Sequence, residues 1–310
     1  MKIVFMGTPD FAVASLDILV KNNYEIAAVV TVPDKPAGRG QKISESAMKQ
    51  YAVANNLRVL QPEKLKSEEF INTLKEINAD LFIVVAFRML PEVVWSMPKL
   101  GTFNLHGSLL PQYRGAAPLN WAVINGEKYS GVSTFFLKHE IDTGSIIFQE
   151  KIEISDDMNV GDLHDKAMVV GAELVLKTVR AIENGNITSI SQSEWMQQHN
   201  MKAEELKHAP KIFKEDREIN WNNTAESIVN LVRGLSPYPV AITKLNNQIL
   251  KIYSAKVHKA NSNLAIGEFE SDGKTYLRFK ASDYLVEVED VQLEGKKRMR
   301  VEELLRGLRL

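Results

Sequence analysis

Apolar runs of strand length alternate with helical patterns through the first part of the chain. Such alternation is typical of βαβ units, in which helices cover both faces of a mostly parallel sheet. The sequence therefore predicts a doubly wound α/β domain over residues 1–188. The runs that predict its strands are KIVFM, EIAAVV, LRVL, LFIVVAF, TFNLH, GVSTFFL and SIIFQEKIEI.

Three segments between these strands have the spacing and end residues of helices. Thr8 and Pro9 suit the N-cap and first position of one helix, and Ser67 suits the start of a second. A third and longer pattern runs from about 160 to 183, with Gly185 just beyond its end. These patterns predict helices that pack on the sheet with one apolar face.

The pattern changes after residue 188. Residues 189–207 are polar and follow no regular period, which predicts a linker. Residues 208–310 carry a short helical pattern and then alternating runs separated by Asn, Gly and Asp. Because such runs are typical of antiparallel strands, this segment predicts a small antiparallel β-barrel of the OB type.

Composition narrows the classes of function. The 310 residues hold no Cys, which excludes disulfides, thiolate nucleophiles and Cys-ligated zinc, and the six His form no HExxH pair that would indicate a metal. The turn GTPDF lacks the GxGxxG spacing of a dinucleotide site. No apolar stretch reaches about eighteen residues and no signal pattern stands at KIVFMG, so we expect a cytoplasmic protein without a membrane span.

Basic side chains gather near the end of the chain. Residues 211–310 hold 17 Lys and Arg against 14 Asp and Glu, which leaves the first part net acidic. Clustered Lys and Arg favour contact with phosphates, and a solvated terminal helix is the alternative interpretation. The clustered residues are Lys296, Lys297, Arg298, Arg300, Arg306 and Arg309.

The stretch FNLHGSLLP, residues 103–111, sets two polar residues inside an otherwise apolar run. Asn104 and His106 are two apart, so in a strand both side chains emerge on one face while Phe103 and Leu105 point the other way. Burying such groups without partners costs roughly 1–3 kcal/mol each, which favours a functional role for them. The alternative is a core His with satisfied hydrogen bonds beside a turn-forming Asn.

A third polar residue, Asp142, lies in the turn EIDTG after the next buried strand. Its carboxylate can reach an imidazole at the end of a neighbouring strand and stabilise the protonated ring, although Asp is also common in turns for local reasons. Asn, His and Asp without a Ser or Cys nucleophile fit direct acyl transfer, in which an amine attacks a carbonyl through a tetrahedral intermediate. Asn104 and His106 would donate hydrogen bonds to the charge that develops on oxygen, and His106 would also carry a proton.

Several segments together resemble the folate-dependent formyltransferase family, and within it the members that act on methionyl-tRNA. In the first domain these segments are FMGTPDF, PDKPAGRGQK, FNLHGSLLPQYRGAAPLNWAVINGE and IDTGSII. In the second domain they are APKIF, INW, LVRGLSPYPVA and GKK. Single-domain members that formylate glycinamide ribonucleotide would stop near the linker, so the second domain separates the two groups.

The resemblance implies transfer of the formyl group of 10-formyltetrahydrofolate to the α-amino group of methionine esterified to initiator tRNA. It implies no metal, no membrane and no obligate protein partner. It also implies a formyltransferase-like fold for residues 1–188 and a tRNA-binding role for residues 208–310. Asn104, His106 and Asp142 match the catalytic residues of the family. The segment that matches its folate contacts is Ser108, Leu109, Leu110 and Pro111.

The resemblance also gives a role to the loop from Thr31 to Ile43. Lys35, Arg39 and Lys42 stand there among Pro and Gly, which is typical of an exposed basic arm, and the matching loop of the family enters the tRNA acceptor region. The family residue aligned with Arg39 is important in that contact. Without the resemblance, an ordinary surface loop is the alternative.

Phe87 and Arg88 stand where family members usually carry Tyr and Gly. We therefore expect the wall of the folate pocket to differ, with Arg88 as a candidate ligand contact. Two other functions stay open at this point. One is a formyltransferase that acts on a sugar-nucleotide amine, which would make little use of Arg39 and the C-terminal basic residues. The other is a tRNA- or folate-binding module without catalysis.

Overall fold

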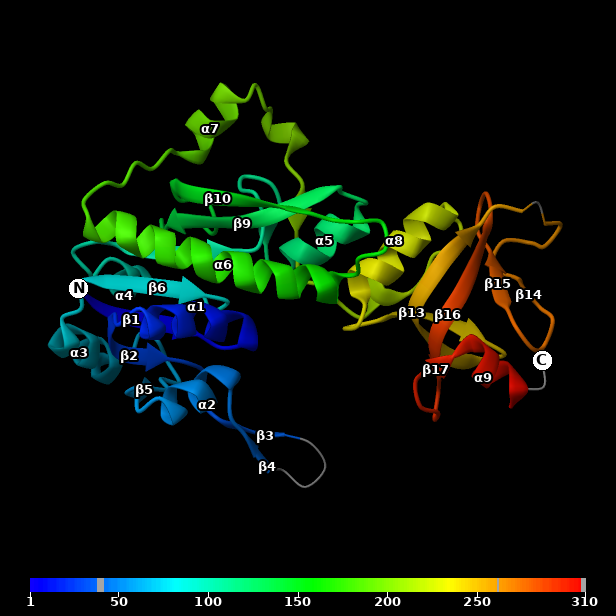
Figure 1. Ribbon diagram of the computed structural model, residues 1–310, viewed down its shortest axis with the longest axis horizontal. Helices are drawn as coiled ribbons and strands as arrows, with labels where there is room; N and C mark the ends of the chain where they lie inside the picture. Colours follow the sequence, from blue (N-terminus) through cyan, green and yellow to red (C-terminus); the bar gives the residue numbers. More distant parts are fainter. Residues whose placement is uncertain (38–41, 261, 308–310) are drawn as a thin grey trace. The chain divides into compact units, whose positions relative to one another are not determined.

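The structure is a computed structural model that describes residues 1–37, 42–260 and 262–307 (Figure 1). Its first sheet has seven strands in the order β10-β9-β7-β6-β1-β2-β5. Strands β5, β2, β1, β6 and β7 run parallel, and β9 runs antiparallel to β7. The predicted mostly parallel α/β sheet is confirmed. The strands are β1 (Lys2–Gly7), β2 (Glu25–Val30), β5 (Val59–Leu60), β6 (Leu81–Val85), β7 (Thr102–His106), β9 (Tyr129–Phe136) and β10 (Ile146–Glu153).

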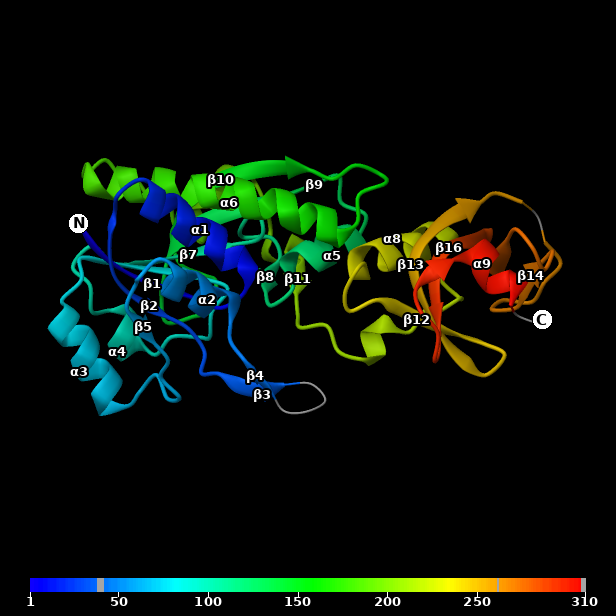
Figure 2. The same ribbon diagram turned by 60° about the horizontal axis from the view of Figure 1, so that its bottom comes forward.

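Helices cover both faces of this sheet (Figures 1 and 2). On one face, α3 and α4 pack against alternate residues of the central strands, among them Val4, Ala28 and Phe82. On the other face lie α1 and α6, where Gly171 of α6 touches Leu105 of β7. Because both faces are covered, the central strands are apolar at nearly every position. The helices are α1 (Asp10–Lys21), α2 (Ala47–Ala54), α3 (Glu68–Ile77), α4 (Glu92–Trp95) and α6 (Val160–Glu183).

The predicted helix ends agree with the structure in two of three cases. Helix α6 spans Val160–Glu183, and Ser67 is the N-cap residue of α3. The prediction for α1 was wrong by one residue, because its N-cap residue is Pro9 rather than Thr8. Pro9 has an extended backbone with ψ of 174°, so the helix begins at Asp10. In the described ranges, no helix combines the length and the apolar character that crossing a membrane requires.

An antiparallel sheet occupies most of the C-terminal part of the chain. Its strands follow the order β12-β13-β16-β15-β14, and β17 pairs with β16. Apolar residues of these strands pack with those of α8 and α9 in one core. The predicted small antiparallel β domain is confirmed as a curled sheet. The elements are α8 (Ala225–Leu235), β12 (Ala241–Leu245), β13 (Gln248–His258), β14 (Phe269–Ser271), β15 (Leu277–Lys280), β16 (Leu285–Leu293), β17 (Met299–Arg300) and α9 (Val301–Arg306).

The segment predicted as a linker contains a helix, α7 (Gln192–Gln198). Ser191 and Glu194 form a capping box at its start, and Trp195 packs on an apolar cluster that includes Phe135. The capping box is the sequence signal that could have located this short helix. Other short elements are β3 (Lys35–Ala37), β4 (Lys42–Ser44), β8 (Arg114–Gly115), α5 (Pro118–Ile124), β11 (His208–Ala209) and the 3₁₀ turns η1 (Ala203–Glu205) and η2 (Glu215–Arg217).

Contacts group the chain into two compact units that do not follow the predicted continuous division. The first unit contains residues 1–115, 131–152 and 164–208, and the second contains 116–130, 153–163 and 209–310. The predicted linker, 189–207, therefore belongs to the first unit. Helix α5 belongs to the second unit because it packs against α8, where Asn120 Nδ2 donates a hydrogen bond to the Gly234 carbonyl at 2.8 Å.

Replacing Gly171 with Val is expected to lower the free energy of unfolding by about 1–3 kcal/mol. A Cβ at this position would lie 2.8 Å from Leu105 Cδ2, so α6 or β7 would have to shift. Urea unfolding measures the change. Glu173→Val, at an exposed position of the same helix, is the control and should stay within about 0.5 kcal/mol of the parent. Equal losses in the two variants would contradict the tight packing of α6 on β7.

Candidate active site

Strand β7 presents Asn104 and His106 on one face of the first sheet. In its register Asn104 pairs with Phe135 and His106 pairs with Ser133 of β9. Leu105 points to the opposite face, where it meets Gly171. The predicted alternation along FNLHG is therefore confirmed. It places the amide and the imidazole together at the carboxyl end of a parallel strand, where ligands of open α/β sheets bind.

His106 is buried, with 7% of its side chain exposed. Its Nε2 lies 2.9 Å from the Tyr113 carbonyl oxygen. Because a carbonyl oxygen can only accept, this hydrogen bond places a proton on Nε2. The other ring nitrogen, Nδ1, is 3.9 Å from Asp142 Oδ2, and the ring meets Phe135 edge-on. Nδ1 thus faces a carboxylate.

Asp142 is held so that its carboxylate faces His106. Its backbone is in the left-handed region with φ of 55°, and its Oδ2 accepts a hydrogen bond from the Gly115 amide at 3.0 Å. The 3.9 Å separation from His106 Nδ1 exceeds hydrogen-bond range, so the interaction is electrostatic. A carboxylate at this distance stabilises an imidazole that has taken up a proton. The structure therefore brings together two residues that lie 36 positions apart in the sequence.

The carboxamide of Asn104 carries an unused acceptor. Its Oδ1 is buried and has no hydrogen-bond partner. A buried acceptor without a partner costs roughly 1–3 kcal/mol, so its presence in a fold calls for an explanation. A ligand with an N–H or O–H donor would satisfy it. This orphaned oxygen makes the face of β7 a candidate site for a polar ligand.

The predicted folate segment, Ser108 to Pro111, is braced from two strands. Ser133 Oγ of β9 accepts a hydrogen bond from the Leu110 amide at 3.1 Å and donates to the Ser108 carbonyl at 2.6 Å. Gln149 Nε2 of β10 donates to the Leu110 carbonyl at 2.8 Å. These bonds fix the backbone of the segment beside His106. Its contact with folate stays a prediction.

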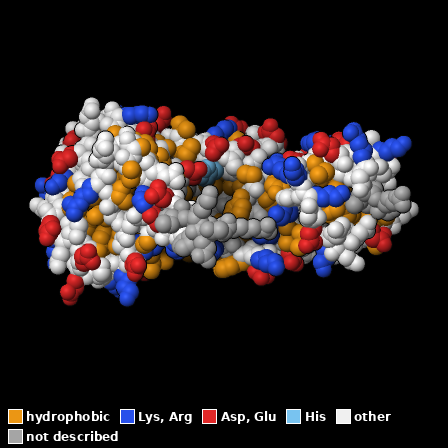
Figure 3. Space-filling model, turned by 90° about the horizontal axis from the view of Figure 1, so that it is seen from below, with side chains coloured by type: hydrophobic (Ala, Val, Ile, Leu, Met, Phe, Trp, Pro, Cys, Tyr) orange, Lys and Arg blue, Asp and Glu red, His pale blue; other side chains and the backbone are white. Residues whose placement is uncertain are grey.

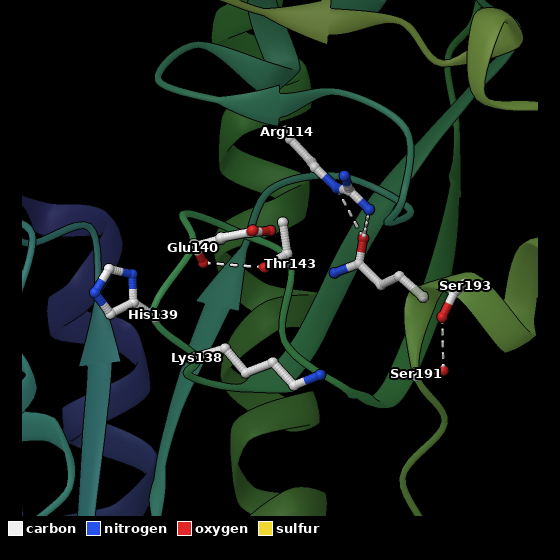
Figure 4. A pocket seen from close by; sticks show the side chains of 8 residues that line it. Arg114, Lys138, His139, Glu140, Thr143, Ser191 and Ser193 are labelled. Atoms are coloured by element: carbon white, nitrogen blue, oxygen red, sulfur yellow. Dashed lines mark hydrogen bonds between the residues drawn. The ribbon is translucent and has the colours of Figure 1, made fainter.

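Two residues that the sequence did not single out hold the Asp142 turn. Gln192 Nε2 donates to the carbonyl of Asp142 at 2.7 Å and to that of Gly144 at 3.0 Å. Arg114 donates to Gln192 Oε1 (Figure 4). Burial lowers the pKa of the Arg114 guanidinium, and the carboxylates of Asp142 and Glu140 act in the opposite direction. Neither residue had a motif around it that indicated this role.

An open pocket of about 550 Å³ lies between the Asp142 turn and the start of α7. Arg114 and Gln192 form part of its wall, and Asp142 itself is not among the residues that line it. Figure 4 shows these side chains. The lining residues are Arg114, Lys138, His139, Glu140, Thr143, Ser191, Gln192 and Ser193.

The basic arm predicted for tRNA begins as a hairpin. Lys35 is exposed at the start of β3, and the backbone of Lys42 pairs with that of Ala37. Arg39 lies outside the described residues. At the base of the arm, Asp34 binds the Lys49 ammonium and accepts a hydrogen bond from Gln61 Nε2 at 2.7 Å. The hydrogen bonds from Lys49 and Gln61 lower the pKa of Asp34.

Arg88 is engaged within the protein. Its Nη2 donates to the Pro62 carbonyl at 2.8 Å and its Nη1 to the Glu63 carbonyl at 3.1 Å. Burial lowers the pKa of its guanidinium. The residue therefore ties the end of β6 to the segment after β5. Among the residues that the structure describes, no group of three or more His, Cys, Asp or Glu is arranged to hold a metal ion.

Comparison with known proteins gives the family. The family model described as formyl transferase matches residues 1–179, and the model described as formyl transferase, C-terminal domain, matches residues 211–309.

The chain belongs to the formyl transferase family.

Curated relatives of this formyl transferase match it along its whole length. Methionyl-tRNA formyltransferase of Bacteroides fragilis is 54% identical over 315 residues, which cover 100% of this chain and 96% of the relative. The protein of the same name from Flavobacterium johnsoniae is 49% identical and covers 99% of this chain and 96% of the relative. The match thus includes α7 and the whole C-terminal sheet.

Solved structures share the fold at lower identity. WlaRD, a sugar 3N-formyl transferase solved with dTDP and 5-N-formyl-THF, has a TM-score of 0.68 at 23% identity and covers 96% of this chain and 99% of that chain. HypX from Aquifex aeolicus in complex with tetrahydrofolic acid has a TM-score of 0.64 at 17% identity and covers 98% of this chain and 47% of that chain. At these identities the likeness supports the formyl transferase fold alone.

Proposed function

We propose that this formyl transferase transfers the formyl group of 10-formyltetrahydrofolate to the α-amino group of methionyl initiator tRNA. The observation that carries the proposal is 54% identity with a methionyl-tRNA formyltransferase over the entire chain, the C-terminal unit included. The arrangement of Asn104, His106 and Asp142 supports the same reaction. The enzyme would act in the cytoplasm, where translation supplies charged tRNA.

The reaction is an acyl transfer between two nitrogens. The methionine amine attacks the formyl carbon, charge develops on the formyl oxygen, and the folate nitrogen leaves with a proton as the new C–N bond is completed. Asn104 would supply an N–H to that oxygen through its carboxamide, in the manner of an oxyanion-hole donor. His106 would take the amine proton on Nδ1 and pass it to the leaving folate nitrogen, and Asp142 Oδ2, at 3.9 Å, would stabilise the charged ring in between.

A sugar-nucleotide amine is the competing acceptor, because WlaRD and related sugar N-formyltransferases share the fold. WlaRD is 23% identical to this chain, compared with 54% and 49% for the methionyl-tRNA formyltransferases of Bacteroides fragilis and Flavobacterium johnsoniae. The full-length match at more than twice the identity favours tRNA as the acceptor. No observation on the site favours a nucleotide sugar.

One assay distinguishes tRNA from a sugar-nucleotide amine as the formyl acceptor. Purified protein and 10-formyltetrahydrofolate are incubated with methionyl initiator tRNA or with a dTDP-amino sugar, and the products are analysed by mass. The proposal predicts formylmethionine on tRNA and little formylated sugar. Formylated sugar without formylmethionine would show that the acceptor is a sugar-nucleotide amine and not tRNA. Binding of tRNA without any formylated product would indicate a non-catalytic module.

The small net charge of the protein gives no strong overall attraction for tRNA, so clusters of basic residues would have to provide it. The net charge is −1, and on the face in Figure 3 Lys and Arg side chains are interspersed with Asp and Glu. Binding to phosphates would therefore depend on particular basic residues. In the proposal these are the arm residues Lys35, Arg39 and Lys42, together with the basic residues near the end of the chain.

Replacing Lys35, Arg39 and Lys42 together with Ala is expected to raise KM for methionyl-tRNA several-fold and to leave KM for the folate donor unchanged. Each phosphate contact that is lost should reduce the salt dependence of tRNA binding by about 0.9 in log K per log salt. Steady-state kinetics at several salt concentrations measure both effects.

A matched control removes three exposed Lys elsewhere in the same unit, at Lys64, Lys66 and Lys75. It makes the same change in net charge and should leave KM for tRNA near the parent value. If both triple variants raised KM equally, the arm would have no specific role.

A further inference from the structure

Gln192 is the most completely satisfied buried polar side chain near the site. It is 3% exposed, yet it lies in the segment predicted as a linker. Its Nε2 donates to the carbonyls of Asp142 and Gly144, at 2.7 and 3.0 Å. Its Oε1 accepts from Arg114 Nε at 2.9 Å and from Nη2 at 2.6 Å. All of the side chain's polar atoms are therefore committed to one geometry.

The two carbonyls that Gln192 binds flank the central part of the catalytic turn. Asp142 has a φ of 55°, which is uncommon for a residue with a Cβ and requires surrounding structure to maintain it. Gly144 fits only because it lacks a side chain, since a Cβ there would lie 1.6 Å from the Phe136 carbonyl oxygen. Close packing at Gly144 and the two hydrogen bonds from Gln192 together hold the turn in this conformation.

Arg114 closes a ring of contacts around Asp142. It orients Gln192 with two hydrogen bonds, and it is the residue immediately before Gly115. The Gly115 amide holds Asp142 Oδ2 at 3.0 Å, while Gln192 holds the Asp142 carbonyl. The carboxylate and the backbone of Asp142 are therefore fixed by one connected network. Figure 4 draws the two hydrogen bonds that Arg114 donates.

We propose that Gln192 is a positioning residue for formyl transfer, which holds the turn so that the Asp142 carboxylate faces His106. The inference rests on the proposed function, in which Asp142 stabilises the charged ring. It makes α7 part of the catalytic unit rather than a spacer. Gln192 does not touch the reacting atoms, so its effect passes through Asp142.

The test compares Gln192→Ala and Gln192→Glu with Gln197→Ala, a control at an exposed Gln of the same helix. Glu keeps the length of the side chain and a strong acceptor for Arg114 but has no N–H for the two carbonyls. Both Gln192 variants should lower kcat on the order of 10- to 100-fold, because displacement of a catalytic group by about 1 Å has effects of this size. KM for methionyl-tRNA and for the donor should change less than about twofold, and Gln197→Ala should match the parent.

A double-mutant cycle separates positioning from a general structural role. In an Asp142→Ala background, Gln192→Ala should lower kcat by less than about twofold further, because the residue it positions is already gone. An undiminished loss in that background would overturn the inference, as would a Gln192→Glu variant with the kcat of the parent. Thermal unfolding of each variant checks that the protein is folded at the assay temperature.

The cycle also distinguishes failure of the inference from failure of the proposed function. If Asp142→Ala retained the kcat of the parent, the proposed role of Asp142 would be wrong. If kcat were lowered in Asp142→Ala but not in Gln192→Ala, only the positioning role of Gln192 would be wrong.

Discussion

Replacing His106 with Ala is expected to lower kcat for formyl transfer to methionyl-tRNA by about 10²- to 10⁴-fold, the usual contribution of a positioned acid–base residue. The ring is buried, its Nε2 is bound to the Tyr113 carbonyl, and its Nδ1 faces Asp142 at 3.9 Å. In the proposed mechanism this ring takes the amine proton, so its removal should slow the chemical step. Single-turnover rates with saturating donor measure the chemical step directly.

The control for this prediction is His164→Ala. His164 lies in α6, where it contacts Phe11 and Asp165 rather than the residues of β7. Its removal should leave the single-turnover rate within about twofold of the parent, as is usual for substitutions away from a site. A His106→Ala enzyme with the parent rate would remove His106 from the mechanism.

The second large effect is expected at Asn104. Asn104→Ala should lower kcat by about 10²- to 10³-fold, the cost of losing one oxyanion-hole donor. The same substitution should have little effect on the free energy of unfolding. The amide oxygen is buried without a partner, so its removal also removes the cost of burying an unpaired acceptor. We expect the free energy of unfolding to stay within about 1 kcal/mol of the parent or to rise.

Asn120→Ala provides the contrast for stability. Asn120 Nδ2 donates to the Gly234 carbonyl at 2.8 Å, so its loss should lower the free energy of unfolding by about 1 kcal/mol. Urea unfolding and rate measurements on both variants check the pair of expectations. An Asn104→Ala protein with the parent rate and reduced stability would show that Asn104 is a structural residue.

The sheet and the direction of its polar residues could be predicted because they depend on local periodicity. A strand turns successive side chains to opposite faces, so the two-residue spacing of Asn104 and His106 was sufficient to place them together. The parallel strand arrangement followed from the alternation of apolar runs with helices. Helix α6 was also predicted, because its 24 residues repeat the amphipathic pattern often enough to be recognised.

The network around Asp142 could not be predicted in the same way. Arg114 and Gln192 are 78 residues apart, and their hydrogen bonds depend on how α7 packs rather than on any local pattern. Gln192 stands in a polar stretch and resembles its exposed neighbours in sequence. The seven residues of α7 are too few to establish a period, so the sequence pattern predicts a linker there. Tertiary packing alone distinguishes the buried Gln from the exposed ones.

Direct formyl transfer can be tested by following the formyl group itself. The enzyme is incubated with 10-formyltetrahydrofolate that carries an isotopic label in the formyl group, first alone and then with methionyl initiator tRNA. Direct transfer predicts no label bound covalently to the protein in the first step, and label on the methionine amine in the second. Label retained on the protein, or no label on methionine, would contradict direct transfer at Asn104, His106 and Asp142.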